Sequence, residues 1–152
     1  MPALIIIVVL IAGFFVMRQF IVPASSPLPD NLGVTGGELT KCPDAPNCVS
    51  TQDDAGNSHY VAPLDFKSDK STTHAALTMI INDMGGQIIT NTDDYIHARF
   101  RSPMMNFIDD VELYLDSSAN SVQMRSAARL GYGDMGVNKK RIESIRQAYN
   151  GA

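Results

Sequence analysis

The sequence predicts an α+β domain that follows one N-terminal apolar helix. Three observations support this fold class: an uncharged apolar run at the start, strand-like alternation of apolar residues between 87 and 129, and helical spacing in the segments that flank this region. The predicted order of elements in the domain is β-α-β-β-β-β-α. We therefore expect a four-stranded antiparallel meander with two helices on one face. The chain of 152 residues is long enough for one such domain and too short for two.

The first element is a predicted transmembrane anchor over residues 2–22. No charged side chain occurs before Arg18, and the chain is apolar again from Phe20 to Val22. A spanning helix needs about 20 residues, and an arginine near its end can extend its charge to the lipid headgroups. A cleaved signal peptide is the alternative. We disfavour it because no basic residue precedes the apolar run and Arg18 follows it.

Residues 23–41 are rich in Pro, Ser and Gly and predict a spacer between the bilayer and the domain of residues 42–150. The domain begins with Cys42-Pro-Asp-Ala-Pro-Asn-Cys48, whose two prolines bring the ends of a short loop together. We expect a disulfide between Cys42 and Cys48, which suits an oxidising compartment. Unpaired thiols are one alternative. A redox or metal site is another, although a redox pair usually has two intervening residues and a metal needs further ligands.

The cysteines and Arg18 disagree about the orientation of the chain. Counted literally, a positive charge after the apolar run places the C-terminal domain in the cytoplasm. One charge is a weak signal, and the expected disulfide indicates the opposite side. We therefore predict a single-pass membrane protein with a periplasmic (non-cytoplasmic) domain.

Within the domain, residues 60–66 predict a short edge strand, because Pro63 cannot donate to a neighbour. A helix follows, capped by Ser71 or Thr72 and ended by the glycines at 85 and 86. The remaining elements are a hairpin of 87–90 and 95–101, strands at 107–115 and 121–129, and a closing helix over 138–149.

The turns between these strands predict which side chains lie opposite one another. Arg99 should face Asp110, His97 should face Glu112, and Glu112 should face Arg125. One face of the sheet then carries alternating charges and the other carries the apolar positions: Ile96, Ala98, Val111, Leu113, Val122 and Met124.

This charged face has three interpretations. It is a solvated lattice of ion pairs, a site where arginines bind a carboxylate or phosphate ligand, or an acid–base site that joins His97 to Asp110 or Glu112. The third is disfavoured because an arginine opposite each carboxylate lowers its pKa. A structural network in which Arg125 and Arg129 hold the turn at 131–138 against the sheet is our main expectation. The candidate ligand-binding residues are Arg99, Asp110, Glu112, Arg125, Arg129, Lys139 and Arg141.

Two of these candidates, Lys139 and Arg141, lie at the start of the closing helix. This helix follows the run Gly131-Tyr-Gly-Asp-Met-Gly136. This run matches the dinucleotide fingerprint, but a later parallel strand and a distant acidic residue are missing. An anion site at the helix N-terminus, with Lys139, Lys140 and Arg141, is a weaker possibility. We expect instead a turn whose glycines adopt positive φ, capped by Asp134 or Asn138.

Composition excludes several functions. A net charge of −4 and a pI near 5.2 disfavour a nucleic-acid partner, which needs a basic surface. The sequence predicts no metal and no cofactor, since its three histidines and two cysteines lack zinc-site spacing.

Three blocks of sequence resemble the DUF1499 domain, a family of unknown function. They are Cys42–Ser50, Phe107–Glu112, and Arg125–Asn138 together with Arg141. Members occur in bacteria, often after an N-terminal membrane segment, and in the thylakoid lumen of plants. Ala128 and Gly133 replace an expected serine, which weakens any role for hydroxyls there. The resemblance implies an exported location but supplies no reaction.

We therefore expect a membrane-anchored envelope protein that contacts the lipid bilayer through residues 2–22 and binds, without catalysis, an anionic small ligand or an envelope protein. The alternative is a hydrolase acting on an anionic envelope substrate; a structural subunit of a membrane complex is a third possibility. A pocket containing a carboxylate with a raised pKa would favour the enzyme, and an ion-paired flat face would disfavour it.

Overall fold

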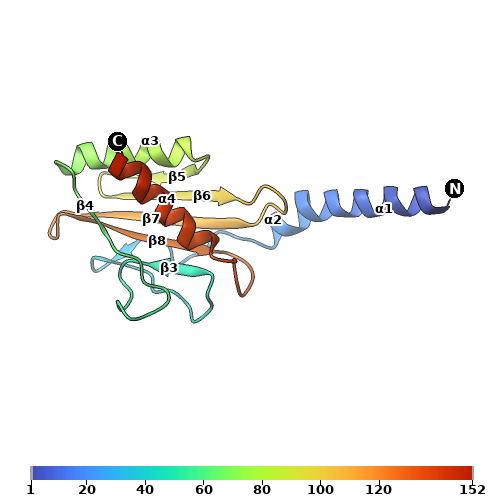
Figure 1. Cartoon of the computed structure of the whole chain (residues 1–152), viewed down its shortest axis with the longest axis horizontal. Coiled ribbons are helices and arrows are strands. Elements are labelled where there is room, and N and C mark those ends of the chain that lie inside the picture. Colours follow the sequence, from blue (N-terminus) through green and yellow to red (C-terminus); the bar gives the residue numbers. More distant parts are fainter. Residues whose placement is uncertain (1, 152) are drawn as a thin grey trace.

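The α+β class is confirmed by the structure, a computed structural model that describes residues 2–151. A main antiparallel sheet, a small two-stranded sheet and two helices form the described part of the domain, and a long N-terminal helix projects from one end of it (Figure 1).

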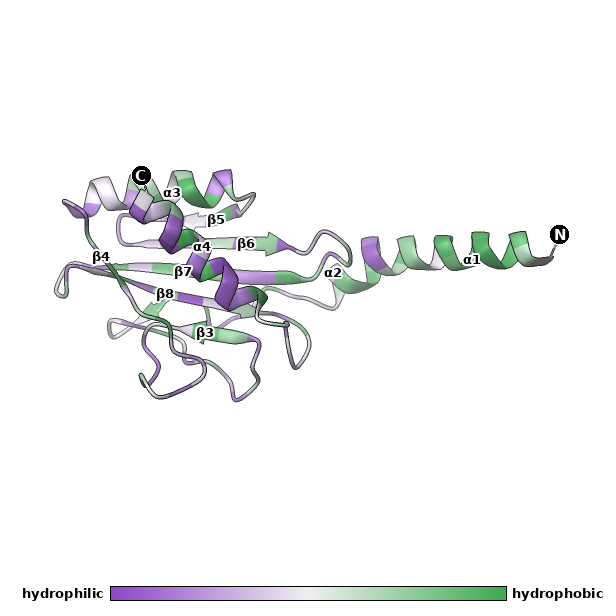
Figure 2. Cartoon of the chain, viewed as in Figure 1, coloured by the Kyte–Doolittle hydropathy of each residue, from purple (hydrophilic) through white to green (hydrophobic). Residues whose placement is uncertain are grey.

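The N-terminal helix is continuous over 23 residues. It comprises α1 (Pro2–Val16), the π-helical η1 (Met17–Ile21) and α2 (Val22–Ala24). The apolar side chains of α1 and η1 are exposed, whereas Val22 of α2 is buried, and Figure 2 shows α1 as hydrophobic along its length. By length and composition this helix is sufficient to cross a bilayer, a criterion that a signal sequence also meets.

The main sheet has six strands rather than the four we predicted. A meander of four strands in the order β8-β7-β6-β5 is extended by β3 and β4, which both pair with β8. Of the two, β3 was missed because three residues carry no readable alternation, whereas β4 is the paired part of the edge strand predicted over 60–66. The bounds are β3 Cys48–Ser50, β4 Leu64–Asp65, β5 Gln87–Asn91, β6 Tyr95–Arg101, β7 Ile108–Asp116 and β8 Ser121–Ala128.

The predicted register is confirmed at all three positions. Arg99 pairs with Asp110, His97 with Glu112, and Glu112 with Arg125 across antiparallel neighbours. Alternation therefore sends these charged side chains to one face and the apolar side chains to the other.

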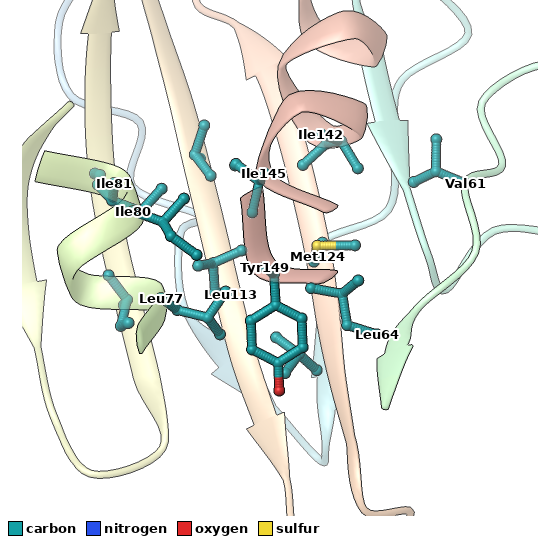
Figure 3. Close-up of a cluster of buried hydrophobic side chains, with 14 of the residues drawn as sticks. Val61, Leu64, Leu77, Ile80, Ile81, Leu113, Met124, Ile142, Ile145 and Tyr149 are labelled. Atoms are coloured by element: carbon teal, nitrogen blue, oxygen red, sulfur yellow. The ribbon is translucent and has the colours of Figure 1, made fainter. Parts of the chain in front are cut away.

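The apolar face packs against α3 (Lys70–Asp83) and α4 (Val137–Gly151). Figure 3 shows Leu77 and Ile81 of α3 and Ile145 and Tyr149 of α4 converging on Leu113. The predicted cap of α3 is wrong: Asp69, rather than Ser71 or Thr72, accepts a hydrogen bond from the Thr72 amide at 2.8 Å. A carboxylate in that place also suits the positive end of a helix dipole.

The opposite, charged face is covered by residues 25–41, which we call the strap. It contains the small hairpin of β1 (Val34–Thr35) and β2 (Glu38–Leu39) and buries Ser26 and Leu39. Gly33, with φ of +109°, turns the strap so that its amide points at the sheet. The segment predicted to be a spacer thus packs on the domain. It leads into the Cys42–Cys48 disulfide, which is confirmed, with Cα atoms 5.6 Å apart.

Candidate functional site

Glu112 lies at the centre of the charged face, fully buried on β7. Its Oε2 atom accepts a hydrogen bond from Arg125 Nη1 at 2.8 Å. Its Oε1 atom accepts two more, from the Tyr95 hydroxyl and from the Gly33 amide of the strap, each at 2.8 Å. Burial, and then the negative charge of Glu112, raise the pKa of Tyr95, so this hydroxyl remains a donor.

Asp110, two residues earlier on the same face, is also buried. Arg129 binds both of its oxygens at 2.8 Å, and His97 Nε2 lies 2.7 Å from Oδ1. Burial alone would raise the pKa of Asp110. The hydrogen bonds from Arg129 and His97 outweigh burial and hold this pKa below its usual range.

Arg125 and Arg129 each bind a carboxylate of the sheet rather than the turn at 131–138. Arg129 also donates a hydrogen bond from Nη1 to the Ser26 carbonyl of the strap at 3.1 Å. Arg99, although opposite Asp110 in register, donates instead to Gln87. The interpretation as a solvated lattice is wrong because the strap excludes water from Asp110, Glu112 and Arg125. The network is a buried set of ion pairs that holds the strap on the sheet.

Arg141 lies on the other face of the sheet, with the helices. Its Nη2 atom donates to Asp109 Oδ2 at 2.8 Å, and its guanidinium lies 4.8 Å from the ring centre of Phe100. Lys139 is exposed. The structure therefore separates the candidate residues into the strap-side network of Asp110, Glu112, Arg125 and Arg129, Arg99 paired with Gln87 on β5, Arg141 behind the sheet, and Lys139 on the surface.

The glycine turn before α4 has the expected local structure. Gly131 and Gly136 have positive φ, and Asp134 accepts hydrogen bonds from the amides of Gly136 and Asn138. Asn47 and Asn138 fasten this turn: Asn47 donates to the Gly131 carbonyl and Asn138 donates to the Asn47 carbonyl. The carboxylate of Asp134 thus does the capping that the sequence predicted for Asp134 or Asn138.

A cavity of about 150 Å³ lies between this turn and the loop joining β6 to β7. We call it the Asp109 cavity. Its walls carry the apolar side chains Phe107, Ala128, Leu130 and Val137 and the carboxylates Asp109 and Asp134. Burial raises the pKa of Asp109, and the Arg141 guanidinium offsets only part of this effect. Of the two carboxylate oxygens of Asp109, only Oδ2 takes part in a hydrogen bond within residues 2–151.

The sequence analysis missed Asp109, although the sequence contains a signal for it. Asp109 occupies a position whose neighbours on the same face are Phe107 and Val111, so a carboxylate interrupts the apolar alternation of β7. Such an interruption costs desolvation energy unless the carboxylate has a partner. Its partner, Arg141, comes from a helix more than thirty residues later.

The site and its sheet lie within a segment that matches a known family. The model of "Protein of unknown function (DUF1499)" matches residues 38–149. The chain belongs to the DUF1499 family. The match runs from β2 to α4 and so contains the charged face and the Asp109 cavity, while most of the strap and the N-terminal helix precede it.

The DUF1499 match carries no reaction or ligand with it. No curated protein matches this chain. Among residues 2–151 there is also no group of three or more His, Cys, Asp or Glu side chains that could hold a metal ion. The function of this DUF1499 protein therefore has to be inferred from the geometry of its own residues.

Proposed function

We propose that this DUF1499 protein is a membrane-anchored binding module of the cell envelope, with its domain on the non-cytoplasmic side. The 23-residue apolar N-terminal helix supports the anchor. The Cys42–Cys48 disulfide supports the location, because disulfides persist in oxidising compartments and are rare in the cytoplasm.

The observation that carries the binding function is the Asp109 cavity, a mainly apolar hollow with a buried carboxylate. Sites for small ligands are typically apolar hollows with few, well-placed polar groups. The charged face is a poorer site, because an anion would have to displace Asp110 or Glu112 from the arginines that bind them.

The chemistry of the cavity walls defines the class of ligand. Asp109 and Asp134 line the cavity, and among the described residues none of the lining side chains is basic. We therefore propose an amphipathic ligand with an apolar body and a hydrogen-bond donor or cationic head that meets Asp109. This replaces the anionic ligand expected from the sequence.

Filling the cavity tests this proposal. Ala128 lies opposite Asp109 in the β7–β8 register, so Ala128→Leu places a larger side chain beside the carboxylate. Ala119→Leu, in the exposed turn between the same strands, is the matched control. Native mass spectrometry of the full-length protein purified from membranes should show a bound small molecule in the wild type and control and its loss in Ala128→Leu. A wild-type protein without any bound molecule, or equal retention by both variants, contradicts the proposal.

A hydrolase remains the second candidate because of Asp109. A carboxyl group with a raised pKa in a hollow is the type of group that serves as a general acid. Two observations disfavour a hydrolase. Asp109 is already ion-paired with Arg141, and Asp134 already accepts hydrogen bonds from the amides of Gly136 and Asn138. Asp109→Asn separates the two functions: it abolishes hydrolysis of any substrate found, whereas a binding module retains an apolar ligand with weaker affinity.

A further inference from the structure

We propose that the two loops around the Asp109 cavity rest in the interfacial layer of the bilayer that the N-terminal helix crosses, so that the cavity opens at the lipid surface. The loops are residues 102–107, between β6 and β7, and residues 129–136, between β8 and α4, whose first residue is Val137. This inference rests on the proposed membrane anchor and adds a second, peripheral contact with the same membrane.

The loops carry large apolar side chains that the domain does not bury. Met135, Tyr132 and Met104 are 97 %, 77 % and 72 % exposed. Phe107 and Val137 beside the cavity are also exposed. We call these five residues the apolar rim. Single exposed apolar residues are ordinary, but several on adjoining loops indicate a surface that contacts another apolar phase.

The position of the rim identifies that phase as lipid. Arg18 of the N-terminal helix donates to the Pro103 carbonyl at 3.2 Å, and Asn106 donates to the Arg18 carbonyl at 3.3 Å. The loop beside Met104 is therefore attached to the helix itself. Figure 1 shows both loops at the end of the sheet from which the helix departs.

The loop is attached to the N-terminal helix before the helix ends. Arg18 lies six residues before Ala24, the last residue of the continuous helix, which corresponds to a rise of about 9 Å. The loop at Pro103 is thus level with the last turns of the spanning helix and not beyond them. An arginine at the edge of the hydrocarbon extends to the headgroups, so the loop bound to Arg18 lies among them.

The residue types around the rim also fit a lipid interface. Tyrosine is enriched at the boundary between hydrocarbon and water. Arg101, Lys139 and Lys140, which adjoin the two loops in sequence, are exposed. Each basic side chain near an anionic lipid surface contributes about 1 kcal/mol of attraction. These exposed basic side chains contrast with the net charge of −4 for the whole chain.

A protein partner would also cover an apolar rim, and tryptophan probes distinguish the two occupants. The sequence contains no tryptophan, so Met104→Trp, Met135→Trp and Ala119→Trp each create a single reporter. Ala119 follows β7, whose nine residues span about 30 Å, so it lies at the far end of the sheet from the rim. Each full-length variant is reconstituted into vesicles of phosphatidylethanolamine and phosphatidylglycerol, with or without lipids brominated near the top of the acyl chain.

We expect Met104→Trp and Met135→Trp to emit at shorter wavelength and to be quenched by the brominated lipid, because interfacial apolar side chains are buried about 5–10 Å into the boundary of headgroups and acyl chains. Ala119→Trp should be unchanged. If the chain floats with the vesicles but either rim probe emits as in water without quenching, the rim proposal is overturned and the anchor stands. If the chain does not float with the vesicles at all, the anchor itself fails.

Discussion

Arg125 and Glu112 show what a single buried charge contributes to this fold. Arg125 Nη1 binds Glu112, while Arg125 Nε is buried without a partner among the described residues. Removing one member of a buried pair leaves the other charge without compensation. We therefore expect Arg125→Gln to lower the free energy of unfolding by about 3–5 kcal/mol. Thermal and urea unfolding of the protein in detergent micelles measures this loss.

The exposed Lys139 provides the control for this prediction. Lys139→Gln removes a positive charge that has no buried partner, so the change should stay within about 0.5 kcal/mol. If the two variants unfold alike, the charged face does not hold the strap.

Asp109 and Asp110 are neighbours in sequence whose pKa values move in opposite directions. The stability contributed by Asp110, with its lowered pKa, is complete above the ordinary aspartate pKa of about 3.9 and is lost as pH falls through the lowered value. The contribution of Asp109, with its raised pKa, is present below that ordinary value and is lost as pH rises through the raised one.

The two carboxylates therefore predict opposite effects on acid unfolding. As pH falls below the ordinary aspartate pKa of about 3.9, Asp110→Asn should lose stability less steeply than the wild type, and as pH rises above that value, Asp109→Asn should lack the loss of stability that the raised pKa causes. Urea midpoints measured on both sides of this value give both slopes. Parallel curves for the two variants would show that the two carboxyl groups share one environment.

At the scale of elements, the strap is the segment whose structure differs most from what its composition predicts. Its prolines and glycines predict a mobile spacer, whereas the Gly33 amide donates to the buried Glu112. We expect this amide to exchange its hydrogen slowly, through larger opening of the structure. The Gly36 amide, at the exposed tip of the β1–β2 hairpin, is the internal control and should exchange rapidly. Equal exchange at Gly33 and Gly36, followed by NMR, would mean that the strap is detached in solution.

The two faces of β7 have different roles. Of its even-numbered residues, Glu112 binds the strap directly and Asp110 binds Arg129, which donates to the strap. Odd-numbered Val111 and Leu113 form the core with α3 and α4. Asp109 is the exception on the core side, close to the N-terminal end of the strand. Both the charge and the cavity are tolerated there because Arg141 reaches this end from α4.

At the scale of the whole molecule, orientation in the membrane is the most direct prediction. An alkaline phosphatase reporter fused after Ala152 should be active outside the cytoplasm, because the Cys42–Cys48 disulfide suits an oxidising compartment. The fusion should also stay with the membrane fraction after a high-salt wash, which releases proteins held by charge alone. A reporter that is active only in the cytoplasm, such as a fluorescent protein unable to mature after export, is the converse control. Its activity at this position would overturn the orientation.

The sequence by itself determined the periodic features of this protein. An apolar run defines the N-terminal helix, period-two alternation defines the four meander strands, and turn lengths define their register, including Glu112 opposite Arg125. All of these depend on residues close in the chain, where backbone geometry limits the choices. The three blocks that resemble DUF1499 were equally readable.

Only the tertiary structure decided what covers each face. Nothing in the periodicity of residues 25–41 indicates that they fold back over the sheet, because the strap is held by single contacts such as Gly33 to Glu112 across 79 positions of sequence. The same holds for Asp109 and Arg141, and for the attachment of Arg18 to the loop at Pro103. Such contacts between distant segments depend on the final packing of several elements at once. Because of them, the charged face is a buried support rather than a ligand site, and the loop beside the cavity is attached to the N-terminal helix.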